Sequence, residues 1–164
     1  MKDFSFQKIT AADVDQLFAV RSSVRENPFS IDALAREGIT VKSVTESLGN
    51  SHDGYLCKSA DVVAGFAMAD VKAGELWVIA VLPEYERRGI GRELLRLTEE
   101  LLWSAGHASI WLWTGGDRGT RAFRLYMSAG WTESELKGRQ LFMTKARANK
   151  AMESPTNFNN ATLA

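Results

Sequence analysis

Residues 75–91 of the chain read ELWVIAVLPEYERRGIG. This segment begins as an apolar run, continues through a proline, and ends in a basic turn with glycine at positions 89 and 91. The apolar run predicts a buried strand, and the amphipathic segment 89–105 predicts a long helix. A glycine-rich turn at the start of a helix presents backbone N–H groups at the positive end of the helix dipole. The segment therefore predicts a phosphate-binding turn.

The composition limits the class of protein. The chain has 164 residues, of which 45% are hydrophobic, and its formal net charge is +0. This length and apolar content suit one domain, and the lack of a basic excess favours neither nucleic acid nor a membrane as partner. Cys57 is the one cysteine, which excludes an internal disulfide and suggests a cytoplasmic location. With two histidines, ligands for a metal are scarce, and we predict no metal site.

Hydrophobic periodicity predicts a mixed α/β chain, with a turn at residues 49–54. Strands are predicted at 4–9, 55–58, 62–72, 76–82, 109–113, 131–135 and 140–144, and helices at 11–23, twice within 30–48, at 89–105 and at 120–129. The short links between the second, third and fourth strands predict an antiparallel meander. A full helix precedes the fifth strand, which predicts a parallel βαβ unit. We expect one domain over residues 1–147 and a disordered tail over 148–164.

Three kinds of glycine turn compete for the segment 81–91. A Rossmann fingerprint needs a third glycine at position 94, which is Leu94, and a P-loop needs Gly-Lys followed by Ser or Thr, which the chain lacks. The run VLPEYERRGIG at 81–91 instead resembles the acetyl-CoA-binding motif of the GNAT superfamily of N-acetyltransferases. RAFRLY at 121–126, followed by AGW at 129–131, resembles a later motif of the same family.

The order of the predicted elements over residues 4–145 is also similar to the GNAT topology. The resemblance implies an α/β fold with a mixed, mostly antiparallel central sheet of about seven strands. About four helices would flank it, and a βαβ unit would bind acetyl-CoA. The segments VRENP at 24–28 and GTRA at 119–122 further resemble an uncharacterised GNAT subgroup.

The resemblance implies an acetyl-CoA-dependent N-acetyltransferase. Acetyl-CoA would be the acyl donor, and a primary amine of an unidentified small molecule or peptide would attack it directly in a ternary complex. The alternative is a non-catalytic acyl-CoA-binding module or sensor with the same fold. A homodimer is left open. The carboxylates of Glu26, Asp32, Glu37 and Glu46 would favour a cationic acceptor, although a solvated helical face explains them equally.

The family motifs also imply roles for particular residues. Tyr126 matches the general acid that protonates the departing thiolate, although a core aromatic is the alternative. Glu75 matches the general base of some members, and the alternatives are an exposed residue after a turn or a base made of water. The cofactor would contact Ile79, Val81, Arg87, Arg88, Gly89, Ile90, Gly91, Arg92, Thr120 and Arg121.

Two positions depart from the family pattern. Glu86 stands where the turn motif usually has Gln or Arg. Its carboxylate would repel a pyrophosphate unless it turns outward, and Arg87 and Arg88 are the candidates to offset its charge. Gly119 stands where the later motif often has Asn, so that Thr120 or Arg121 would have to supply the missing polar contact.

Overall fold

The computed structural model describes residues 3–26 and 29–148. The helix break expected near residues 27–28 and almost all of the predicted tail lie outside these ranges. Within them, none of the helices combines the length and apolarity that crossing a bilayer requires.

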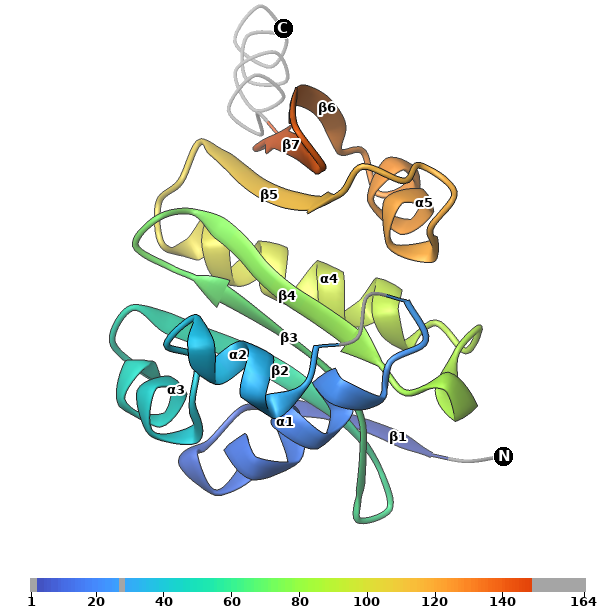
Figure 1. Cartoon of the computed structure of the whole chain (residues 1–164). Helices are drawn as coiled ribbons and strands as arrows, with labels where there is room; N and C mark the ends of the chain where they lie inside the picture. Colours follow the sequence, from blue (N-terminus) through green and yellow to red (C-terminus); the bar gives the residue numbers. More distant parts are fainter. Residues whose placement is uncertain (1–2, 27–28, 149–164) are drawn as a thin grey trace, which may run out of the picture.

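Seven strands in the described part of the chain form one sheet in the order β1-β2-β3-β4-β5-β7-β6 (Figure 1). Their bounds are β1 Phe4–Lys8, β2 His52–Ser59, β3 Val62–Asp70, β4 Glu75–Val81, β5 Ser109–Gly115, β6 Thr132–Lys137 and β7 Gln140–Ala146. Neighbouring strands are antiparallel except β4 and β5, which run parallel. The predicted meander and βαβ unit are confirmed.

Five α-helices flank the sheet in the described ranges, as the periodicity predicts, whereas the family resemblance implied about four. Their bounds are α1 Val14–Ser23, α2 Ile31–Arg36, α3 Val41–Ser47, α4 Ile90–Ser104 and α5 Arg121–Ser128. Short 3-10 turns precede α1 at Ala11–Asp13 and α4 at Pro83–Tyr85.

The helices cover both faces of the sheet (Figure 1). Buried side chains of α1 and α3 pack with Phe66, Met68 and Ala80 on one face. On the other face, Leu95 and Leu102 of α4 pack with α5, with Trp131 and with strands β5 and β7 of the sheet. The apolar stripe of α4 therefore closes one half of the core, as its periodicity predicts.

The predicted turn at 49–54 is wrong over its second half, because β2 begins at His52. Gly54 lies inside this strand, paired with Met68 of β3. A Cβ at position 54 would lie 2.1 Å from the carbonyl oxygen of Ala67, so this glycine permits a close approach of two strands rather than a turn.

Candidate active site

The parallel strands β4 and β5 separate almost as soon as they meet. Within the described residues, their pairing is confined to Glu75 and Trp111, where the Trp111 N–H donates to the Gly74 carbonyl at 3.0 Å. Beyond this point the two strands diverge toward α5 (Figure 1). The two strands are therefore splayed, and the splay frees the later backbone groups of β4 on the side toward β5.

A β-bulge accompanies the splay. The register between β3 and β4 passes from Met68 opposite Val78 to Ala69 opposite Leu76, which leaves Trp77 as an extra residue on β4. As a result, both Trp77 and Val78 pack against the core on the α1 and α3 face. A bulge at this position bends β4 beside the opening.

A cavity of about 1240 Å³ occupies the opening between the strands. It is lined from β4, from the turn before α4, from α5, and from the segment around α1 and α2. The predicted site residues that line it are Ile79, Val81, Arg87, Gly89, Ile90, Gly91, Arg92, Arg121 and Tyr126. The structure thus brings most of the predicted site together, whereas Arg88, Thr120 and Glu75 are not among the lining residues.

The turn before α4 opens its backbone into the cavity. Arg87 and Gly89 have left-handed backbone angles, with φ of 62° and 80°. Gly89 is the N-cap of α4, and no side chain caps this end, whereas Ser30, Thr40 and Thr120 cap α2, α3 and α5 with their hydroxyls. The first-turn N–H groups of α4 are therefore suited to hold an anionic phosphate.

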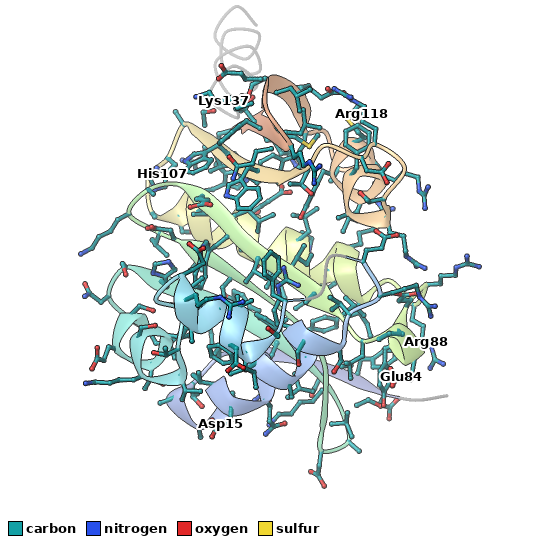
Figure 2. The ribbon with its side chains drawn as sticks, in the orientation of Figure 1. Asp15, Glu84, Arg88, His107, Arg118 and Lys137 are labelled. Carbon is teal, nitrogen blue, oxygen red and sulfur yellow. The ribbon has the colours of Figure 1, made fainter. Side chains whose placement is uncertain are left out.

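Arg88 and Thr120 lie apart from this opening. The Arg88 guanidinium is 5.8 Å from the ring centroid of Tyr85, and Figure 2 shows Arg88 at the outer edge of the molecule near Glu84. The Thr120 hydroxyl accepts a hydrogen bond from the Phe123 N–H at 3.2 Å. Their predicted cofactor contacts remain predictions, and in this structure both side chains have local roles.

Glu86 is the centre of an ion cluster at the cavity wall. Its Oε2 accepts a hydrogen bond from Nη1 of Arg121 at 2.8 Å and lies 3.4 Å from Nε of Arg25. The side chain of Glu86 is only 15% exposed. Glu26 adds a second link, because its Oε2 accepts from the Arg121 backbone N–H at 2.9 Å. Glu86 is therefore paired with Arg121 and Arg25. That Arg87 and Arg88 offset its charge toward a pyrophosphate remains a prediction.

Tyr126 lies on α5 and contributes to the core and to the cavity together. Its ring is 6.1 Å from that of Trp131, and its side chain lines the cavity. Burial raises the pKa of Tyr126, while the charge of Arg21 acts in the opposite direction. The phenol is therefore protonated at neutral pH, and burial makes it a weaker acid than an exposed tyrosine. Its role as general acid remains a prediction.

Glu75 lies at the far end of β4. Leu76 packs on the α4 face, so Glu75 projects to the opposite face by strand alternation. Burial, with a further contribution from Asp70, raises the pKa of Glu75 to about 7. His52 connects this region to the cavity, since its Nε2 lies 3.9 Å from Asp70 Oδ2 and its ring lies 4.6 Å from that of Trp77.

Sequence reasoning left several lining residues without a site role. They are Arg21, Arg25, Phe29, Trp113, Arg124 and Gln140. The resemblance of residues 24–28 to a family subgroup drew attention to this segment without giving Arg25 a role of its own. These residues line one cavity because segments about 100 residues apart in the sequence come together in the fold. Local sequence patterns do not predict such contacts.

Comparison with known proteins agrees with this geometry. The family model described as the acetyltransferase (GNAT) family matches residues 19–131. An uncharacterised protein of Mycobacterium leprae is 34% identical over 141 residues, which cover 80% of this chain and 35% of that protein. The ribosomal protein bS18 alanine N-acetyltransferase of Salmonella typhimurium is 34% identical over 94 residues, covering 54% of this chain and 63% of the enzyme. The chain thus matches less than two thirds of either curated relative.

Among solved structures, the PaiA N-acetyltransferase of Thermoplasma acidophilum, in complex with coenzyme A, has a TM-score of 0.75. Its sequence identity is 21%, and the superposition covers 88% of this chain and 99% of that one. At this identity the likeness establishes the fold.

Proposed function

Since the chain belongs to the acetyltransferase (GNAT) family, we propose that it transfers an acetyl group from acetyl-CoA to a primary amine of a small molecule or peptide. The observation that carries the proposal is the coincidence of three features in one cavity. These are the separated strand β4, the uncapped start of α4, and the phenol of Tyr126.

Each part of the cavity has a task in this proposal. The backbone N–H groups of residues 89–92 bind the pyrophosphate at the start of α4. The free edge of β4 at Ile79 and Val81 orients the pantetheine arm, and its amides polarise the thioester carbonyl as an oxyanion hole does. Acetyl-CoA supplies an acetyl group activated as a thioester.

The chain's own residues move the protons. An amine of pKa about 10.4 is almost wholly protonated at neutral pH, so it must lose a proton before its lone pair attacks the carbonyl carbon. Glu75, with a pKa of about 7, accepts that proton through water, because it lies outside the cavity lining. As the C–S bond breaks, sulfur keeps the electron pair and Tyr126 donates its phenolic proton to the thiolate. The phenolate then takes up the second proton, which the acylated nitrogen loses as the amide forms.

The test separates cofactor binding from turnover. Acetyl-CoA binding is measured by calorimetry and CoA release is measured with a panel of amines that includes an alanine-terminated peptide. Tyr126→Phe should bind acetyl-CoA within about twofold of the wild type and lose roughly 100-fold or more in CoA release. Tyr55→Phe is the matched control, because Tyr55 lies on β2 outside the cavity lining.

Two results would contradict the proposal. Acetyl-CoA binding without CoA release for any amine would indicate an acyl-CoA sensor. Thermal stabilisation by ATP or NAD, with none by acetyl-CoA, would indicate a nucleotide-binding protein instead.

A further inference from the structure

The end of the cavity away from the pyrophosphate turn is apolar. It extends beneath α1, α2 and α3, where Met68, Trp77 and Val78 of the sheet lie with Leu34 and Ile39. These side chains belong to or pack against the main core cluster of that face. A ligand group placed there gains free energy by removing apolar surface from water, at roughly 25 cal/mol per Å².

The carboxylates of the cavity are largely committed to the protein. Those that line it are Glu26, Glu37 and Glu86. Glu86 holds Arg121 and Arg25, and Glu26 accepts the Arg121 backbone N–H. Glu37 is exposed at the end of α2, where water screens its charge.

Two further acidic residues that could favour a cationic acceptor, Asp32 and Glu46, do not line the cavity. Both are exposed, and Glu46 lies 4.0 Å from Lys42. The solvated helical face is therefore the better account of these two carboxylates.

Arg21 also lines the cavity, and its guanidinium lies 4.6 Å from the ring centroid of Phe29. An acceptor with a second ammonium group would have to desolvate that group in a cavity that already holds this cation, which is costly without a dedicated carboxylate.

These observations bear on how many charged groups the acceptor carries, and they do not identify the molecule. Building on the proposed acetyl transfer, we propose that the acceptor is a monoamine whose remaining part is uncharged and apolar, seated against Trp77, Val78 and Leu34, and that polyamines are poor substrates. One amine enters toward the splayed strands, and the apolar part fills the space beneath α2.

A matched pair of substrates tests this. Hexylamine and hexamethylenediamine have the same length and differ by the second amino group. With wild-type protein and acetyl-CoA, kcat/KM should be at least about tenfold higher for hexylamine. Calorimetry on the CoA-loaded protein should show the same order of affinity, which provides a readout independent of turnover.

Variants of α2 localise the effect. Leu34→Glu places a carboxylate in the apolar end and should shift the ratio toward the diamine by about tenfold. Leu34→Gln, of the same length without the charge, should not favour the diamine. Ile31→Glu is the matched control, because Ile31 is on the same helix, is 57% exposed and does not line the cavity. Its ratio should stay within about twofold of the wild type.

Equal or better use of the diamine by the wild type would overturn the inference, and so would loss of diamine activity in Glu37→Gln. Both outcomes would leave acetyl transfer itself intact. If Leu34→Glu fails to fold, the wild-type substrate pair and the calorimetry still decide. Absence of CoA release with every amine would instead remove the proposed function.

Discussion

Oε2 of Glu86 accepts a hydrogen bond at 2.8 Å from Nη1 of Arg121, which joins the turn before α4 to the first residue of α5. The pair gives a physical account of the acidic residue at a position where the family motif usually has Gln or Arg. A lone carboxylate beside a pyrophosphate site would oppose binding, whereas a paired one is offset. The same contact joins the helix of Tyr126 to the turn before α4.

Arg121→Gln should therefore weaken acetyl-CoA binding. The substitution removes the closer of the two arginines that pair with Glu86 at the cavity wall. Because the carboxylate is then less well neutralised, we expect the KM for acetyl-CoA to rise by about tenfold or more. Steady-state kinetics at low ionic strength, where exposed charges are least screened, measures the effect.

The double variant Glu86→Gln/Arg121→Gln removes both charges and should recover most of the loss. Arg118→Gln is the control, because Arg118 pairs with Glu133 at 2.6 Å across two elements and does not line the cavity. A KM in Arg121→Gln equal to that of the control would show that the pair has no part in cofactor binding.

The two glycines of the turn should respond differently to alanine. A Cβ on Gly91 would meet Leu125 Cδ2 at 3.5 Å and Val81 Cγ2 at 3.8 Å, which are ordinary contacts inside the protein. Gly91→Ala should thus keep acetyl-CoA affinity within about threefold and raise the free energy of unfolding by about 0.5 kcal/mol, because alanine is the better helix former.

Gly89→Ala should lower both quantities. Gly89 has a φ of 80°, and a Cβ there would meet no atom within 4 Å, so it would project into the space that the cofactor approaches. We expect a loss of about 1 kcal/mol in stability from the left-handed backbone and at least a roughly tenfold loss of affinity. Urea unfolding measures the stability of both variants, and calorimetry measures their affinity for acetyl-CoA. Equal changes in the two variants would contradict the different surroundings of the two Cβ positions.

Much of this fold follows from local signals. The amphipathic run of α4 and the short links of the meander both predicted their elements, because each depends on residues a few positions apart. The resemblance of two motifs supplied the chemistry, and the cavity gathers most of the residues that it implied.

The remaining features depend on contacts that are distant along the chain. The insertion of β7 between β5 and β6 leaves no mark in either strand, and the bulge at Trp77 reflects how β3 and β4 pair. Glu86, Arg25 and Arg121 come from three separate segments. Their pairing could not be predicted, because sequence places each charge without its partner.

Glu75 should affect stability in a pH-dependent way. Its pKa is raised from 4.5 to about 7, chiefly by burial and further by Asp70. The folded state thus holds this proton more tightly than the unfolded state does. The stability from the protonated form is complete below about pH 4.5 and is lost as the pH rises through about 7. Glu75→Gln should therefore gain stability relative to wild type between pH 5 and pH 8, as measured by urea unfolding. A constant difference would contradict the raised pKa.

The same pKa makes a kinetic prediction that bears on the role of Glu75 as base. If Glu75 must be ionised to accept the amine proton, kcat should rise with pH through about 7, and Glu75→Gln should lose this rise and roughly 100-fold in rate. Asp70→Asn is the informative second variant, because it removes a negative charge that raises the pKa of Glu75. Its rise should move to lower pH, with the acetyl-CoA affinity unchanged. A purely structural Glu75 would alter stability in these variants without moving the pH midpoint of kcat, and an unchanged pH profile in Glu75→Gln would assign the base to water alone.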